Sequence, residues 1–137
     1  ISFLPCFIFL YLRRSINNSN AHATSCTCYH AHSSFNVNDN AVIDGFTIQD
    51  GYTPKEGGGI YVKNFVKVRN CIIKNNQGGD GAGIYADNKC EITDCKIYGN
   101  VARSKDGGAF CESSILTYCE INNNLIDIYC RCRHLNI

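Results

Sequence analysis

A ten-residue segment occurs four times between residues 42 and 124, and this repeat restricts the possible folds more than any other feature of the chain. The copies align without gaps: VIDGFTIQDG from residue 42, KVRNCIIKNN from 67, EITDCKIYGN from 91 and ILTYCEINNN from 115. Successive copies begin 25, 24 and 24 residues apart. A period of this length is typical of a solenoid, in which each repeat stacks on the previous one.

Four columns of the aligned repeat carry the pattern. Three are apolar, and the fourth begins with glycine and continues with asparagine. The columns are Ile43, Val68, Ile92 and Leu116; Phe46, Cys71, Cys95 and Cys119; Ile48, Ile73, Ile97 and Ile121; and Gly51, Asn76, Asn100 and Asn124. A glycine junction recurs independently as GGGIYV from 57, GAGIYA from 81 and GGAFCE from 107, which aligns Ile60, Ile84 and Phe110.

Two solenoids have a period in this range. The leucine-rich repeat has the consensus LxxLxLxxN, which VRNCIIKNN (68–76) fits, but its second half needs a helix, and here that half contains glycine pairs, which disfavour a helix. A parallel β-helix accounts for both halves, because every segment alternates between inward and outward residues. We therefore predict an all-β, right-handed parallel β-helix of three to four coils of 24–26 residues over residues 38–129, with the leucine-rich solenoid as the alternative.

The rest of the 137-residue chain gives weaker signals. Residues 1–14 are apolar, and twelve helical residues rise only about 18 Å, so we expect a truncated signal or anchor, a cap over the fold, or sequence foreign to the domain. The Asn, Ser and His content of residues 15–37 predicts a linker-like segment, and we expect 130–137 to form a tail. Because the chain begins with Ile and contains no Met, we expect a fragment that packs against neighbouring coils or caps of a longer parent chain.

The net charge of +1 and pI near 7.7 provide no basic surface, so nucleic acid is not an expected partner.

The repeat motifs resemble a known family. GGGI (57–60), GAGI (81–84) and GGAF (107–110) resemble the GGA[ILV] motif of polymorphic membrane proteins and related β-helix adhesins. The segments 73–76, 97–100 and 121–124 resemble the FxxN motif of that family, with Ile in place of Phe. The resemblance covers roughly residues 38 to 124 and implies a secreted or surface-displayed protein used for adhesion.

The asparagine and cysteine columns are expected to be structural. Stacked carboxamides can hydrogen-bond from coil to coil, and asparagine tolerates a left-handed corner. The thiols of Cys71, Cys95 and Cys119 occupy an apolar column and are predicted to be free and buried. Cys130 and Cys132 either pair with each other, pair with another cysteine or stay free.

Two groups of residues are candidate metal ligands. Glu56, Asp80 and Asp106 each precede the glycine junction, so they either line up as a calcium site or serve as ordinary turn residues beside Lys55 and Lys105. The second group is His22, Cys26, Cys28, His30 and His32, whose spacing suits zinc but matches no standard finger. No other cofactor is expected.

One outward column is a candidate binding surface. Tyr61 is expected to lie over Tyr85, with Cys111 continuing the column, and such rings either bind the apolar face of a sugar or only stabilise the sheet. Polysaccharide lyases and pectin hydrolases share the pectin lyase-like coil, but the chain lacks the Asp-Asp and Gly-His-Gly motifs of pectin hydrolases, so no catalytic residue is assigned.

We therefore predict a non-enzymatic stalk or adhesin-like segment, secreted or on the cell surface, whose partner is a carbohydrate or a host or cell-surface protein. The alternative is a fragment of a carbohydrate-active enzyme whose site lies on coils outside this sequence.

Overall fold

The computed structural model describes residues 20–22, 26–27, 35–105, 107–125, 128–131 and 135–136, and describes side chains for 39–103 and 107–125. Every regular element within these residues is a β-strand, and they contain no helix. The first strands are β1 (Asn20–His22), β2 (Cys26–Thr27), β3 (Phe35–Asn38), β4 (Val42–Asp44), β5 (Thr47–Gln49) and β6 (Ile60–Lys63). They are followed by β7 (Lys67–Arg69), β8 (Ile72–Lys74), β9 (Gln77–Asp80), β10 (Ile84–Asp87), β11 (Glu91–Thr93) and β12 (Lys96–Tyr98). The last are β13 (Val101–Lys105), β14 (Ala109–Glu112), β15 (Ile115–Thr117), β16 (Glu120–Asn122), β17 (Ile128–Arg131) and β18 (Leu135–Asn136).

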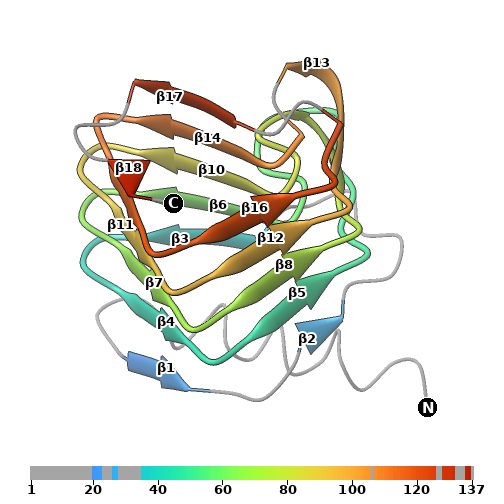
Figure 1. Ribbon diagram of the computed structural model, residues 1–137. Coiled ribbons are helices and arrows are strands. Elements are labelled where there is room, and N and C mark those ends of the chain that lie inside the picture. Colours follow the sequence, from blue (N-terminus) through green and yellow to red (C-terminus); the bar gives the residue numbers. More distant parts are fainter. Residues whose placement is uncertain are drawn as a thin grey trace.

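The strands form three long parallel sheets that wrap around one core (Figure 1). One sheet has the order β1-β4-β7-β11-β15-β18, the second β17-β14-β10-β6-β3 and the third β16-β12-β8-β5-β2, while β13 and β9 form a short fourth sheet. The chain visits the three long sheets in turn, so strands about two dozen residues apart lie side by side. This is the predicted parallel β-helix. The leucine-rich alternative is wrong, because the second half of each repeat forms a strand rather than a helix.

The apolar columns stack as the repeat predicts. Ile43 pairs with Val68, Val68 with Ile92, and Ile92 with Leu116, and all four side chains are buried. The isoleucine column is likewise in register from Ile48 to Ile121. The flanking residues of these three-residue strands face outward, as in β7, where buried Val68 lies between exposed neighbours. The core is therefore a stack of aliphatic side chains, each contacting its equivalent in the next coil.

The register at the third glycine junction differs from the prediction by one residue. Ile84 pairs with Ala109, and Tyr85 pairs with Phe110. Phe110 is therefore not the equivalent of Ile84, and Cys111 points inward and is fully buried instead of continuing the tyrosine column. The segment between Ile97 and Ala109 is one residue longer than its equivalent in the preceding coil, and the link that follows β14 is one residue shorter. The two changes cancel, which kept the flanking columns aligned.

The sheets also extend beyond residues 38–129. Strands β1 and β2 and most of β3 lie in the stretch 15–37, where the composition suggested a linker, and part of β17 and all of β18 lie in or next to the expected tail. They pair with the end coils through β1–β4, β2–β5, β3–β6, β14–β17 and β15–β18. Residues 1–14 lie outside the described residues.

Glycines permit close approach of coils at the junction. At Gly58 a Cβ atom would collide with the carbonyl oxygen of Gln77 and lie 2.6 Å from that of Ala82. No side chain fits there, because Gly59 N donates to the carbonyl of Ala82 across the same contact.

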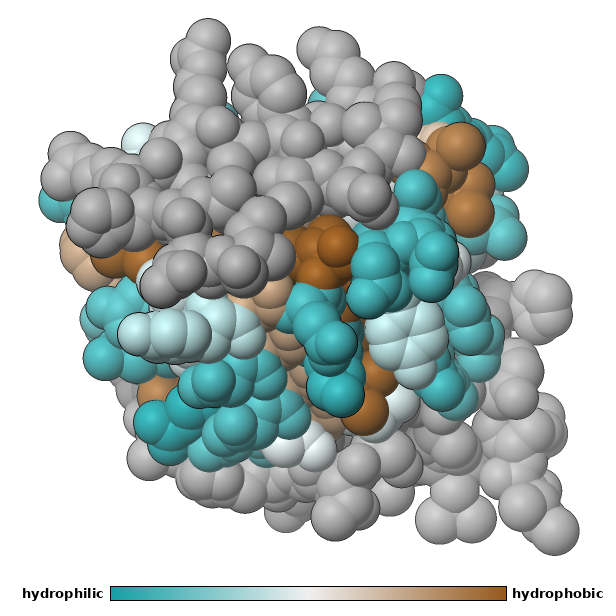
Figure 2. All heavy atoms as spheres, viewed as in Figure 1, coloured by the Kyte–Doolittle hydropathy of each residue, from teal (hydrophilic) through white to brown (hydrophobic). Residues whose placement is uncertain are grey.

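In Figure 2, the described part of the visible face is mostly hydrophilic, with hydrophobic side chains in separate small groups. No helix long and apolar enough to cross a membrane occurs in the described residues.

Candidate binding surfaces

The buried asparagine column holds successive coils together. The Nδ2 of Asn76 donates to Oδ1 of Asn100 over 3.0 Å, and Asn100 makes the same bond to Asn124 over 2.9 Å. Each Oδ1 also accepts from the backbone N–H of the asparagine one coil earlier. Asn76 and Asn100 are completely buried, and their Nδ2 groups also donate to the carbonyls of Ile48 and Ile73. The asparagine column therefore forms a ladder of hydrogen bonds that joins successive coils.

The left-handed corner lies one residue before this column. Asn75 and Asn123 have φ values of 54° and 52°, and Gly99 has 66°, whereas Asn76 and Asn100 are not among the residues with positive φ. The expectation that the buried asparagines themselves take the left-handed conformation is therefore wrong. Their side chains are needed for hydrogen bonding inside the coil, while the residue before each one makes the turn.

The cysteine column forms a row of free, buried thiols, as predicted. Cys71, Cys95 and Cys119 are at most 3% exposed. Each Sγ is within 3.1–3.3 Å of the carbonyl oxygen two residues earlier in its own coil, at Arg69, Thr93 and Thr117 respectively. The S–H groups therefore have acceptors within the fold, as buried polar groups require.

The tyrosine column is a stack of parallel rings. The ring centroids of Tyr61 and Tyr85 are 5.1 Å apart with 5° between the planes, and Phe110 continues the stack 4.6 Å beyond Tyr85 at 10°. Burial disfavours the phenolate, which raises the pKa of Tyr61 and raises that of Tyr85 to about 12. Because each ring covers the face of the next, the stack presents ring edges and hydroxyl groups to a ligand. This arrangement suits sheet stabilisation better than stacking on a sugar face.

The expected acidic column is interrupted by a basic residue. The backbone pairing of β9 with β13 places Lys105, rather than Asp106, opposite Asp80, next to an irregularity in the register. Asp106 itself lies outside the described residues, as do Cys28, His30, His32 and the side chains of His22 and Cys26. Over the residues with described side chains, no group of three or more His, Cys, Asp or Glu could hold a metal ion.

Among the residues with described side chains, four ion pairs join neighbouring coils on the outer faces. Each carboxylate of these pairs contacts a cation at the equivalent position of the next or previous coil. The pairs are Arg69–Asp44 at 2.8 Å, Lys96–Glu120 at 3.3 Å, Lys67–Glu91 at 3.5 Å and Lys63–Asp87 at 3.6 Å. Such exposed pairs contribute about 0–1 kcal/mol each. They favour the observed register, because each pair forms only when the two coils are aligned in this way.

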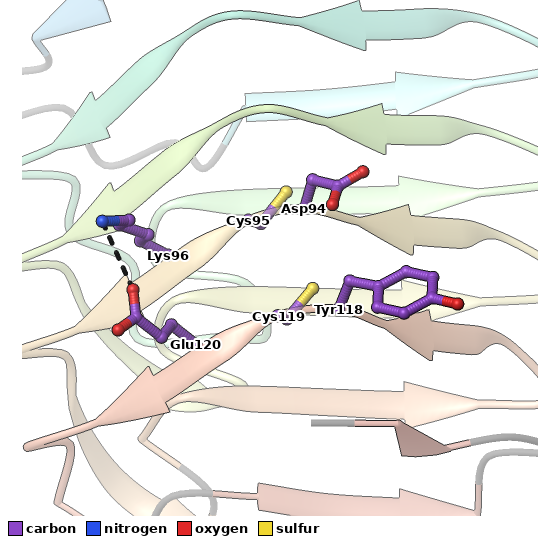
Figure 3. A pocket seen from close by; sticks show the side chains of 6 residues that line it. All are labelled: Asp94, Cys95, Lys96, Tyr118, Cys119 and Glu120. Atoms are coloured by element: carbon purple, nitrogen blue, oxygen red, sulfur yellow. Dashed lines mark ion pairs between the residues drawn. The ribbon is translucent and has the colours of Figure 1, made fainter.

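A shallow groove of about 440 Å³ lies at the corner between the β11-β15 and β12-β16 sheets. Figure 3 shows its lining, in which the Lys96–Glu120 ion pair is at one end and Asp94 and Tyr118 are at the other, with the sulfur atoms of Cys95 and Cys119 between them. A second, smaller groove adjoins it and shares Lys96 and Glu120, adding Tyr98 and Asn122. The two grooves form one continuous surface, called here the corner groove.

Tyr118 is the most unusual residue of the corner groove. Its side chain is 70% exposed, and its backbone has a φ of 53°. The same corner of the earlier coils holds Gly45, Asn70 and Asp94, which are the residue types that tolerate this conformation. A bulky residue with positive φ is a real outlier, and such strain is concentrated at functional sites. Sequence reasoning missed it, although the mismatch in an otherwise tolerant column was visible in the alignment.

The corner groove does not resemble a hydrolase site. Glycoside hydrolysis uses two carboxyl groups that face each other across the sugar. In Figure 3, Glu120 points toward Lys96, while Asp94 points away from it on the side of Tyr118. The two carboxylates therefore face different ends of the groove.

No model of a known protein family matches the chain, and comparison with curated proteins and with solved structures gave no match.

Proposed function

We propose that this chain is a non-enzymatic segment of a secreted or surface-displayed β-helix protein, which acts as a stalk and binds carbohydrate in an adhesin-like manner through the corner groove. The observation that carries the proposal is Tyr118, an exposed aromatic side chain kept in a strained corner conformation beside the groove. At the same corner of the other coils the residue is Gly45, Asn70 or Asp94, and these residue types take this conformation at lower cost than tyrosine.

The chemistry of the corner groove favours a polar ligand with one apolar face. Tyr118 offers a largely exposed ring, and the Lys96–Glu120 pair supplies both a hydrogen-bond donor and an acceptor within the groove. Asn122 adds an exposed carboxamide where the second groove adjoins. Binding sites of this type combine an aromatic contact with a few polar groups that orient the ligand. An uncharged polysaccharide segment is the ligand class that fits these groups best.

The non-enzymatic part of the proposal is supported by how the polar groups are used. The buried polar side chains of the described core are Thr53, Asn76, Asn100 and Ser114, and the asparagines are fully engaged between coils. Four described carboxylates are in ion pairs. These groups bind one coil to the next, and such contacts stabilise an elongated structural segment such as a stalk.

Retention of the protein on a panel of immobilised neutral and acidic polysaccharides tests the proposal. We expect the wild-type chain to be retained on at least one neutral polysaccharide and the Tyr118→Asn variant to lose most of this retention. Phe65→Asn is the matched control, because Phe65 is also an exposed aromatic residue with a left-handed φ of 63°, but lies at a different corner. Loss of retention in both variants, or no retention on any polysaccharide, would contradict the proposal.

The enzymatic alternative is tested with the same polysaccharides in solution. New reducing ends would indicate hydrolysis, and unsaturated products would indicate a lyase. Either product, formed by purified protein and abolished by Glu120→Gln, would replace the proposed function with a carbohydrate-active one.

A further inference from the structure

The row of three thiols has a geometry that the stalk does not need. Cys71, Cys95 and Cys119 occupy equivalent positions of three successive coils, because the residues that follow them, Ile72, Lys96 and Glu120, pair in register. Phe46 fills the same column in the preceding coil, so an apolar side chain would satisfy the packing. Three adjacent coils nevertheless present sulfur atoms in a single line.

The spacing of this line matches a particular kind of metal coordination. Neighbouring parallel strands lie about 4.8 Å apart. A metal–thiolate bond is about 2.3 Å long, so two such bonds placed in line span about 4.6 Å. An ion midway between two stacked sulfur atoms would therefore be bound linearly by both without moving the backbone.

We propose that the thiol row of Cys71, Cys95 and Cys119 binds a soft monovalent metal ion, of the class of copper(I), in two-coordinate form between successive sulfur atoms. Soft thiolate ligands select this class of ion. The three thiols do not converge on one point, and the described side chains form no metal-ligating group of three or more, so ions that need tetrahedral or octahedral coordination do not fit. The row offers two such positions, and the sulfur of Cys95 belongs to both.

The binding step is an exchange of protons for the ion. Two S–H bonds break, two sulfur–metal bonds form and two protons leave to solvent, with no change in oxidation state.

The corner groove gives the ion a short route to the row. Cys95 and Cys119 form part of its lining, and in Figure 3 their sulfur atoms lie next to each other and point in the same direction. Cys119 is 3% exposed, so the end of the row lies directly beneath the surface of the groove.

Cys90 lies outside this row. Its backbone N–H donates to the hydroxyl oxygen of Ser114 in the next coil, so a serine follows it in its own column. Cys90 is therefore the matched control for the row: it is buried and free, and serine already occupies its column one coil later.

Anaerobic titration with copper(I), in competition with a chromogenic copper(I) chelator, tests the proposal. The starting chain carries alanine at the five cysteines without described side chains, namely Cys6, Cys26, Cys28, Cys130 and Cys132. We expect tight binding by this chain, and an affinity at least about 100-fold lower after Cys95→Ser, because the remaining thiols are then two coils apart. Cys71→Ser and Cys119→Ser should each keep one binding position, and Cys90→Ser should change nothing.

This pattern distinguishes the row from general thiol chemistry. Equal losses for all four serine variants, or binding that survives Cys95→Ser, would overturn the proposal. So would mass spectrometry that finds a disulfide within the row in place of bound metal. If the alanine background does not fold by circular dichroism, the same comparison of Cys95→Ser with Cys90→Ser is made in the otherwise unaltered chain, and the difference in copper bound per chain decides the outcome.

Discussion

The side-chain amide of Asn76 donates to the carboxamide oxygen of Asn100 at 3.0 Å, and the backbone N–H of Asn76 donates to the same oxygen at 3.0 Å. One oxygen atom thus accepts two hydrogen bonds from the previous coil in a fully buried position. Between these coils the amide contact therefore forms part of the coil-to-coil hydrogen bonding, along with the sheet ladders.

Replacing Asn100 by alanine should lower the free energy of unfolding by at least about 2 kcal/mol, because the N–H of Asn76 loses its acceptor and the carbonyl of Ile73 loses its donor inside the core. Chemical denaturation measures the change. Asn122→Ala is the control, since Asn122 is exposed on the neighbouring strand, and its effect should stay within about 0.5 kcal/mol. Equal effects of the two substitutions would show that the amide ladder has no special weight.

Replacing Gly58 by alanine should prevent the junction from closing, because the added Cβ meets the backbone oxygens of Gln77 and Ala82. We expect a loss of at least about 3 kcal/mol, seen as a lower denaturation midpoint. In contrast, Gly99→Asn should remain within about 1 kcal/mol of the wild type. Gly99 has a left-handed φ that asparagine tolerates, and its nearest contact is the side-chain oxygen of Asn75. A tolerated Gly58→Ala would mean that the coils approach less closely than described.

Replacing Tyr118 by asparagine should stabilise the chain by about 1 kcal/mol, because asparagine adopts a positive φ at lower cost than tyrosine. Thermal unfolding checks this value. The same substitution should reduce polysaccharide retention, so stability and binding are expected to change in opposite directions. If Tyr118→Asn leaves stability unchanged, the corner is not strained, and the main argument for a functional groove is lost.

Stability should fall in alkaline solution because of Tyr85. Its pKa is raised from 10.0 to about 12 in the folded chain, with burial as the largest cause. The unfolded chain therefore releases this proton first, and the contribution of Tyr85 is fully present below pH 10.0 and is lost as the pH rises to about 12. Tyr85→Phe should flatten this part of the pH profile, and phenylalanine fits because Phe110 occupies the same column. An unchanged profile in the variant would assign the alkaline loss to other groups.

The sequence predicted the parts of the fold that rest on strict repetition. The columns from Ile43 to Leu116 and from Ile48 to Ile121 stack as expected, because the strands that carry them are short and their corners have constant length. Burial of Cys71 was also predictable, since Phe46 stands in the same column. The hydrophobic effect leaves little freedom at these positions.

The errors have local causes. An extra residue before Ala109 and a missing one after Glu112 compensate each other, so a gapless alignment on either side could not show the shift that brings Phe110 over Tyr85. The sequence pattern did not predict strands β1 to β3. Ala21 pairs with Ile43 and Cys26 pairs with Ile48, and these small side chains give a weaker apolar signal than isoleucine.

The corner groove could not be predicted from the repeat pattern, for a different reason. It depends on the direction in which Tyr118 extends from a left-handed corner, at the opposite end of the groove from the Lys96–Glu120 pair, and on the shape between two sheets. A column of residues gives the order of side chains along the axis, but not the space between one column and the next.

Because the coils stack in strict register, the length of the molecule is set by the number of its coils. Because each coil contacts only the coils directly above and below it, duplication or removal of one whole unit changes the distance between its two ends by about 4.8 Å and leaves the remaining faces as they were. The length of such a chain can therefore change in small, regular steps while the surface of each remaining coil stays the same.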